Sequence, residues 1–450
     1  MGNKNREIIK KALSKRTFTE SGEIYFSSSS TTKIKAHDGE VASFSYADTS
    51  GLGARVVSEN RMGLSYTEKV DEKSIAACLE KAKENSQFIP PDEGYAIYES
   101  DEVKSYNQFK SDDLHAVTVE QKKELAVNIE RFAKEYDERI VNVPEAMYCD
   151  ITNERIISNS YGLLKSEESS LCYAYAYLMA SDGKDTSVGM YFQGERNFAD
   201  LDPEKIARLA AEDALEKLGA EEINSGSYPV VFSSFTASSL LGAFINSGGS
   251  AFFGENLQKG RSKLDGKLGE IIAAPHINII DDPAIFSLGT ASFDDEGIDA
   301  SKHYLVEKGV FKTVLHNIYS GKRGQTESTG NGSRGYSSSL STRLFSPYLQ
   351  KSERSEASLF EEAGRGIYIT DVEGLHAGLD QISGDFSLGA KGFLIENGRK
   401  GKAVTNITVA GNFFGLLKDI IAVADNNRFN DYGDFSSPSI FVKSLSVSGK

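Results

Sequence analysis

The spacing of apolar residues predicts alternating helices and antiparallel strands over the first half of the chain. Residues 5–14, 71–85 and 118–136, and the segment that begins at Asp202-Pro203, carry apolar side chains at helical spacing. Thr118 to Gln121 has the form of a capping box, and proline directly after aspartate is typical of a helix start. The runs between these helices are small, polar and β-branched, which predicts strands.

The predicted helices each have one apolar face. These faces consist of Ile75, Cys78, Leu79 and Ala82 in one helix, Leu125, Ile129, Phe132 and Tyr136 in a second, and Ile206, Leu209, Ala210, Ala214 and Leu218 in a third that ends at Gly219. Asp38-Gly39 and Asp182-Gly183 predict tight hairpins, the second joining strands at 169–180 and 186–193. Residues 86–117 have little periodicity and contain Pro90-Pro91, so we expect a linker or domain edge there.

The pattern of predicted secondary structure changes near residue 225. From Tyr228 to the C-terminus the chain consists of short strand-like runs and glycine-rich turns. The predicted domains are therefore 1–100, 101–224 and 225–450. Because helices and antiparallel strands follow one another without strict βαβ alternation, the predicted class is α+β, with an N-terminal antiparallel sheet and helices followed by a larger strand-rich C-terminal domain.

Composition narrows the function classes. The chain has 450 residues, 39% of them hydrophobic, and a formal net charge of −15. It lacks the basic face that nucleic acid requires and any apolar run of membrane-spanning length, so we expect neither partner. The three widely spaced cysteines, Cys78, Cys149 and Cys172, favour a reducing compartment over a disulfide framework, and the cytoplasm is the expected location.

The residue types that zinc hydrolysis requires are not arranged for it. The closest histidines, His303 and His316, are 13 positions apart, so no helical histidine pair exists. Asp281-Asp282 and the acidic run 294–296 lack the alternation of a calcium loop and are interpreted as turn residues. Residues 330–335 match G-x-G-x-x-G without a preceding apolar strand, which favours a flexible or ligand-facing loop over a dinucleotide site.

A set of motifs in the second half closely resembles the TldD/PmbA family, and specifically its PmbA (TldE) branch. The motifs are Ser292-Phe293-Asp294-Asp295-Glu296-Gly297, Ser328-Thr329-Gly330-Asn331-Gly332, Gly384-Asp385-Phe386-Ser387-Leu388-Gly389-Ala390, Gly392-Phe393-Leu394-Ile395-Glu396-Asn397-Gly398 and Thr408-Val409-Ala410-Gly411-Asn412. Nearer the N-terminus, Gly51-Leu52-Gly53-Ala54-Arg55-Val56 fits the first domain of the same family. The likeness therefore covers nearly the whole chain.

The resemblance implies a peptidase acting on peptides or unfolded segments, built as a cup-shaped dimer around a chamber. In the TldD branch, zinc is carried by a HExxxH helix and a cysteine near the C-terminus. Here the matching helix follows the strand at Val230–Phe232, and the ligand and base positions are Gly242, Ala243 and Ser247. Residues 433–438, which match the cysteine region, contain no cysteine. We therefore expect no catalytic residue, no metal ligand and no cofactor in this chain, and zinc only in a HExxxH-bearing partner.

These observations predict a non-catalytic subunit that pairs with a TldD-like paralogue, or with itself, and holds a peptide or unfolded protein segment. The alternatives are an autonomous peptidase with an unfamiliar site and a homodimeric peptide-binding scaffold. The residues predicted to face the peptide are Thr329, Gly330, Asn331, Gly384, Asp385 and Phe386. Turn geometry and packing between domains are the competing explanation for these six.

Overall fold

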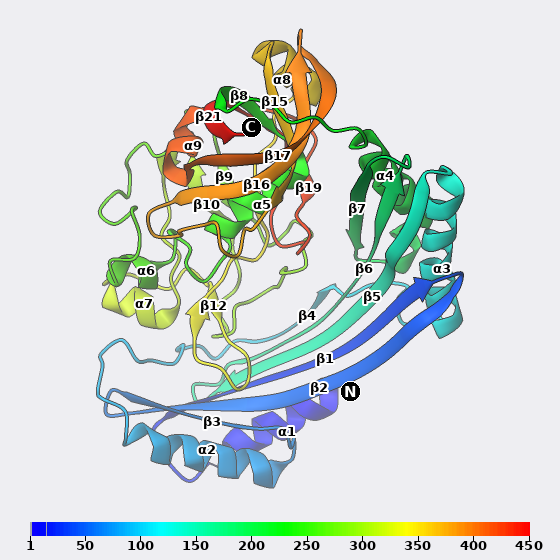
Figure 1. Cartoon of the computed structure of the whole chain (residues 1–450). Coiled ribbons are helices and arrows are strands. Elements are labelled where there is room, and N and C mark those ends of the chain that lie inside the picture. Colours follow the sequence, from blue (N-terminus) through cyan, green and yellow to red (C-terminus); the bar gives the residue numbers. More distant parts are fainter. Residues whose placement is uncertain (1, 15) are drawn as a thin grey trace.

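The computed structural model describes residues 2–14 and 16–450. Within that part of the chain, the N-terminal half forms one seven-stranded sheet in the order β3-β2-β1-β5-β6-β4, with β7 also paired to β6. The four central strands are long and bend into an arc (Figure 1). All neighbours are antiparallel except β4, which runs parallel to β6.

The elements of this half follow the predicted succession. They are α1 (Gly2–Ser14), β1 (Ser21–His37), β2 (Glu40–Ser58), β3 (Arg61–Thr67), α2 (Glu72–Ser86), β4 (Val103–Phe109), α3 (Val119–Tyr136), β5 (Ile140–Asn159), β6 (Leu164–Ser181), β7 (Thr186–Glu195), the 3-10 turn Phe198–Asp200 and α4 (Pro203–Glu216). Since β1 pairs with β5 from Glu23 to Ala36, the predicted domains 1–100 and 101–224 contribute to the same sheet.

Local signals in the sequence match the observed ends of these elements. Asp38 and Gly39 form the β1–β2 turn with φ of 54° and 78°, and Thr118 and Gln121 make both hydrogen bonds of a capping box. The α+β class is confirmed. The linker predicted at 86–117 is wrong for part of its length, because Val103–Phe109 is strand β4. Its side chains are mostly exposed and show no apolar alternation, so its pairing with β6 left no local signal.

Helices cover the convex face of the sheet at both ends. One apolar cluster joins α1 and α2 to the sheet through Ile9, Leu79 and Ile156, and a second joins α3 and α4 to it through Ile129 and Ala210. The concave face is left to the C-terminal half, which sits inside the arc (Figure 1). Among the described helices, none is long and apolar enough to cross a membrane.

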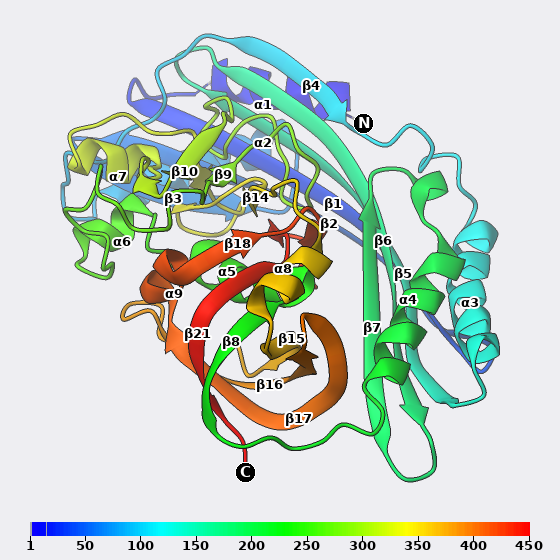
Figure 2. The same cartoon turned by 90° about the horizontal axis from the view of Figure 1, so that it is seen from above.

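The C-terminal half contains a curved sheet in the order β17-β16-β15-β8-β21-β18, which closes on itself because β17 also pairs with β21 (Figure 2). A second sheet has the order β11-β10-β9-β14-β20-β19. The elements are β8 (Gly226–Phe232), α5 (Ser234–Ile245), α6 (Gly254–Gln258), β9 (Ile279–Asp281), β10 (His303–Glu307), β11 (Val310–Phe311), α7 (Ile318–Arg323), β12 (Gly332–Ser333), β13 (Ser341–Thr342), β14 (Pro347–Leu349), α8 (Glu356–Ala363), β15 (Gly366–Glu373), β16 (Asp385–Glu396), β17 (Arg399–Asn412), α9 (Phe413–Asp419), β18 (Ile420–Val423), β19 (Arg428–Phe429), β20 (Ser436–Ser437) and β21 (Ile440–Ser448).

Candidate functional site

Helix α5 carries the positions that the resemblance equates with zinc ligands. It follows β8 as predicted, and the Ser233 hydroxyl caps it by accepting a hydrogen bond from the backbone N–H of Thr236 at 3.1 Å. Gly242 and Ala243 lie in its last turn, and Ser247 is the second residue beyond its end. Nine of its twelve residues are buried, so the helix is a core element of the C-terminal half.

The space beside Gly242 is filled by the chain itself. A Cβ atom at this position would lie 2.9 Å from Cβ of Phe435 and 3.1 Å from Nδ2 of Asn430. Phe435 belongs to residues 433–438, which the resemblance equates with the cysteine region, and Asn430 lies three positions before them. This segment is tied to the end of α5 because Asn246 donates to the carbonyl oxygen of Asp434 at 3.0 Å. A longer side chain at position 242 therefore requires this segment to move.

These residues do not fit a zinc ion. Glycine and alanine offer no ligand atom, and a single serine hydroxyl, although that of Ser247 is buried and without a hydrogen-bond partner, does not replace imidazole or thiolate. Among the residues that the structure describes, His37, Asp38 and Glu130 are the one cluster of three side chains with ligand atoms close enough to share an ion. Glu130 instead accepts the backbone N–H groups of Asp38 and Gly39 at 2.7 and 3.0 Å, so it caps the β1–β2 turn.

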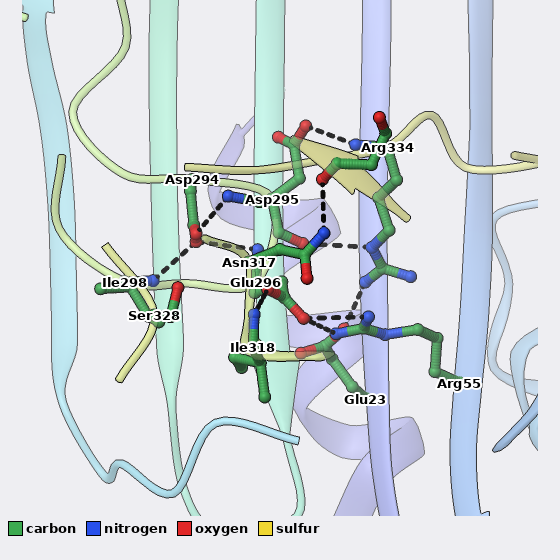
Figure 3. Close-up of polar contacts among 12 residues, drawn as sticks. Glu23, Arg55, Asp294, Asp295, Glu296, Ile298, Asn317, Ile318, Ser328 and Arg334 are labelled. Carbon is green, nitrogen blue, oxygen red and sulfur yellow. Dashed lines mark hydrogen bonds and ion pairs between the residues drawn. The ribbon is translucent and has the colours of Figure 1, made fainter. Parts of the chain in front are cut away.

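The acidic motif at 292–297 lies against the concave face of the N-terminal sheet (Figure 3). Glu296 is fully buried, and its Oε1 accepts from Nη1 and Nη2 of Arg55 at 3.2 and 3.3 Å. Its Oε2 accepts from the backbone N–H of Ile318 at 2.8 Å. Arg55 also pairs with the buried Glu23 at 2.8 Å, and Glu23 in turn accepts from Arg334. An ion network therefore joins strands β1 and β2 to the C-terminal half.

Asp295 makes a second connection to the same sheet. Its carboxylate accepts from Nη1 of Arg155 at 2.7 Å and from the backbone N–H of Arg334 at 2.9 Å. Arg155 pairs on its other side with Glu167. Burial acts to raise the pKa of Asp295, but Arg343 and Arg155 hold it below its usual value. The carboxylate is thus stabilised in its charged form by arginines from both halves of the chain.

Asp294 has a different task, which is to shape the loop. Its carboxylate accepts the backbone N–H groups of Glu296, Ile298 and Gly332 at 3.0, 2.9 and 2.8 Å. Burial, and then the nearby Glu296 carboxylate, raise the pKa of Asp294. Gly297 completes the turn with φ of 88°. The turn interpretation of this acidic run is confirmed for Asp294, whereas the ion pairs of its two neighbours went unpredicted.

The first group of predicted peptide-facing residues lies beside this motif. Asn331 is fully buried, donates to the carbonyl oxygen of Arg343 at 2.9 Å and accepts from Thr329 Oγ1 at 2.7 Å. Gly330 is buried with φ of 74°, and Thr329 is partly exposed. The side chain of Asn331 therefore faces the interior, whereas contact with a peptide stays a prediction for Thr329.

The second group lies beside α5. Phe386 is 3% exposed and packs edge-on against Phe244 of that helix, so its side chain faces the core and not a peptide surface. Gly384 is buried with φ of 83°. Asp385 is exposed and accepts from Asn412 Nδ2 at 2.8 Å. Turn geometry and packing thus explain the side chains of Phe386 and Asn331, and peptide contact stays a prediction for Asp385.

The glycines of the Gly51–Val56 motif allow a close approach between the two halves. A Cβ atom at Gly53 would lie 2.2 Å from the carbonyl oxygen of Tyr336, and one at Gly51 would lie 2.4 Å from the Tyr336 ring. Because Tyr336 packs directly against the backbone of β2 at both positions, this part of the sheet requires residues without side chains. Arg55 of the same motif was visible in the sequence as a lone charge among apolar strand residues, which was the available signal for the ion network.

Comparison with known proteins agrees with the architecture. Three models of the PmbA/TldA metallopeptidase match this chain, with domain 1 at residues 22–86, the central domain at 112–218 and the C-terminal domain at 225–449. A metalloprotease PmbA homologue of Haemophilus influenzae is 27% identical over 437 residues, which cover 95% of this chain and 92% of that protein.

Solved structures show the same fold over the full length. A Thermotoga maritima protein, named as a candidate modulator of a DNA gyrase, superposes with a TM-score of 0.89 at 30% identity and covers 100% of both chains. TldE from Thermococcus kodakarensis superposes with a TM-score of 0.88 at 24% identity, covering 98% of this chain and 99% of that one. The chain therefore belongs to the PmbA/TldD metallopeptidase family, with relatives of the PmbA/TldE type.

Proposed function

We propose that this chain is a non-catalytic subunit of a TldD/PmbA-type metallopeptidase, with zinc held by a HExxxH-bearing paralogue. The observation that carries the proposal is the packing of α5. The three positions that would supply two ligands and a base are Gly242, Ala243 and Ser247, and Phe435 lies against the first of them. Without a bound ion and a base, no water is activated at neutral pH.

A free strand edge supports pairing with another chain. On the far side of the sheet, the outer edge of β6 is covered first by β4 and then by β7. On the near side, β3 pairs with β2 from Leu52 to Ser58, and residues 41–51 of β2 have no outer neighbour among the described strands. Phe44 and Tyr46 on this segment are 46% and 59% exposed. An unpaired edge with exposed aromatic side chains is a surface that proteins usually cover.

The partner that best fits is the paralogue that carries the zinc, with a second copy of this chain as the alternative. The role of this subunit is then to complete the chamber and hold a peptide or unfolded segment for the paralogue to cleave. The buried, unpaired cysteines agree with a reducing cytoplasm as the location of this complex.

The decisive experiment compares the chain alone with the chain co-expressed with a tagged HExxxH-bearing relative from the same genome. Zinc is measured by plasma mass spectrometry, and cleavage is measured on a mixed peptide pool with and without chelator. We expect the chain alone to contain no stoichiometric zinc and cleave nothing, and the co-purified heterodimer to contain zinc and cleave. The matched control is the same heterodimer with the relative's motif glutamate replaced by glutamine.

Two results would contradict the proposal. Chelator-sensitive cleavage by the pure chain would show an autonomous peptidase. Separate elution of the two proteins, with homodimers of this chain that bind peptides without cleaving them, would instead show a scaffold.

A further inference from the structure

A cavity of about 290 Å³ lies between the concave face of the N-terminal sheet and the C-terminal loop 286–291. Five charged side chains line it, namely Arg155, Glu167, Arg196, Asp295 and Arg343. Three guanidiniums thus face two carboxylates, which leaves one positive charge in excess inside a chain of net charge −15. We call this space the arginine pocket.

The two carboxylates are already occupied. Both pair with Arg155, which also donates to the carbonyl oxygen of Phe293 at 3.1 Å. Neither Arg196 nor Arg343 has a carboxylate within ion-pair distance in the described part of the chain, although Glu167 acts on Arg196 and Asp295 on Arg343 from further away. Each donates one hydrogen bond to a backbone carbonyl, Arg196 to Gln108 at 3.1 Å and Arg343 to Gly289 at 3.4 Å. A guanidinium has five N–H donors, so most of the donors on these two remain available.

Burial makes this arrangement costly unless a ligand completes it. The Nε atom of Arg343 is buried and has no hydrogen-bond partner. Arg196 lies over the rings of Phe109 and Phe286, 4.9 and 5.5 Å from their centroids, and this burial lowers its pKa. Folded proteins normally provide an anionic partner for a cation that is partly removed from water. Because both carboxylates of the pocket make their close ion pairs with Arg155, an anion that enters from outside would supply the close partner that Arg196 and Arg343 lack.

The remaining walls favour an amphipathic anion over a bare ion. Ser27 and Ser29 of β1 and Ser169 of β6 line the pocket, and their hydroxyls make no side-chain hydrogen bond within the described chain. Phe109 and Phe286 supply apolar surface next to Arg196. Planar guanidiniums match the two oxygens of a carboxylate, and the serines offer further donors.

The position of the pocket connects it to the region that replaces the zinc site. Leu288 lies in its wall and donates its backbone N–H to the carbonyl oxygen of Gly433 at 3.1 Å. Gly433 belongs to the same segment as Phe435, which lies against Gly242. A peptide anchored in the pocket would thus lie near the segment that packs against Gly242.

We propose that the arginine pocket binds the free C-terminal carboxylate of a peptide, with Arg196 and Arg343 as its ligands and an apolar last residue against Phe109 and Phe286. This inference rests on the proposed role in peptide handling and specifies which end of the peptide this subunit holds. It requires no metal and no partner chain.

The test uses the full-length chain and calorimetric titration at low salt with N-acetyl-Ala-Ala-Phe, as the free acid and as the C-terminal amide. We expect the acid to bind at least about tenfold more tightly than the amide, since hydrogen bonds between charged groups are among the strongest in proteins. In Arg196→Gln and in Arg343→Gln the preference for the acid should shrink towards unity. The control Arg208→Gln, on the outer face of α4, should leave it unchanged.

Arg196→Lys separates charge from geometry, and an intermediate preference is expected because lysine keeps the charge and loses the planar fork. Equal binding of acid and amide would overturn the inference while leaving the heterodimer and cleavage results untouched. Binding of inorganic phosphate with no preference for the acid would also overturn it, by showing a site for small free anions. Failure of both peptides to bind would do the same, whereas failure to form a heterodimer bears on the proposed function alone. Circular dichroism of each variant confirms that it is folded.

Discussion

Replacement of Arg55 by methionine should weaken the attachment of the C-terminal half to the sheet. Arg55 is 1% exposed and is shared by the buried carboxylates of Glu23 and Glu296. Without it, Glu23 keeps its contact with Arg334, but Glu296 keeps only the backbone N–H of Ile318. Removing one partner of a buried ion pair costs about 3–5 kcal/mol, because the remaining charge is left unpaired away from water. We expect a loss of stability of that size.

The pH dependence of this loss provides an independent check. Burial already raises the pKa of Glu296, and Arg55 acts to lower it, so the pKa should rise further in Arg55→Met. A carboxyl whose pKa is higher in the folded than in the unfolded state adds stability at low pH and loses it as the pH rises through the folded value. The variant should therefore be closer to wild type at pH 5 than at pH 8.

The measurement is urea unfolding followed by circular dichroism, since the chain contains no tryptophan. Arg208→Met is the matched control, because Arg208 is 45% exposed and pairs with Glu212 on the surface of α4. It should cost less than about 1 kcal/mol. Arg55→Met combined with Glu296→Gln should cost about 1–3 kcal/mol less than the sum of the two single variants. A cost for Arg55→Met below about 1 kcal/mol, or strict additivity, would refute the argument.

Two further variants test close approach and the free edge. Gly53→Ala should destabilise the chain by about 1–3 kcal/mol, because its Cβ would meet the carbonyl oxygen of Tyr336 at 2.2 Å. In the control Gly248→Ala the new Cβ meets nothing within 4 Å, so this variant should be nearly neutral in the same urea assay. Replacing Phe44 and Tyr46 together by serine should leave the stability of the isolated chain within about 0.5 kcal/mol and reduce heterodimer recovery on size exclusion at least severalfold; unchanged recovery would place the interface elsewhere.

The elements that the sequence predicted correctly are those with a local cause. The turn at Asp38-Gly39 depends on two residues that adopt positive φ, and the start of α3 depends on the capping box of Thr118 and Gln121. Strand β4 was missed because its structure depends on Leu164 to Ser169, about 60 residues further along the chain, and its own side chains remain mostly exposed.

The residues of the candidate site also fall into those that a local sequence match can find and those that only the fold brings together. The zinc-ligand positions could be found by matching one helix, and the structure places that helix after β8. The buried pairing of Arg55 with Glu296 joins residues 241 positions apart, so no window of sequence contains both. Asn331 and Phe386 were assigned to a peptide surface because motif membership does not distinguish an exposed residue from a buried one. Arg196 and Arg343 belong to no quoted motif, and the fold alone brings them together.

The long separation within the ion network also determines when the network can form during synthesis. A ribosome adds about 5–20 residues per second, so roughly 12–50 seconds pass between the emergence of Arg55 and that of Glu296. During that interval Arg55 has Glu23 as a partner but not Glu296, and the pair lies on a face that the rest of the chain has yet to cover. The concave face of the N-terminal half thus stays uncovered until the C-terminal half is synthesised. Translational pausing between residues 55 and 296 would lengthen the exposure of this face to chaperones and proteases.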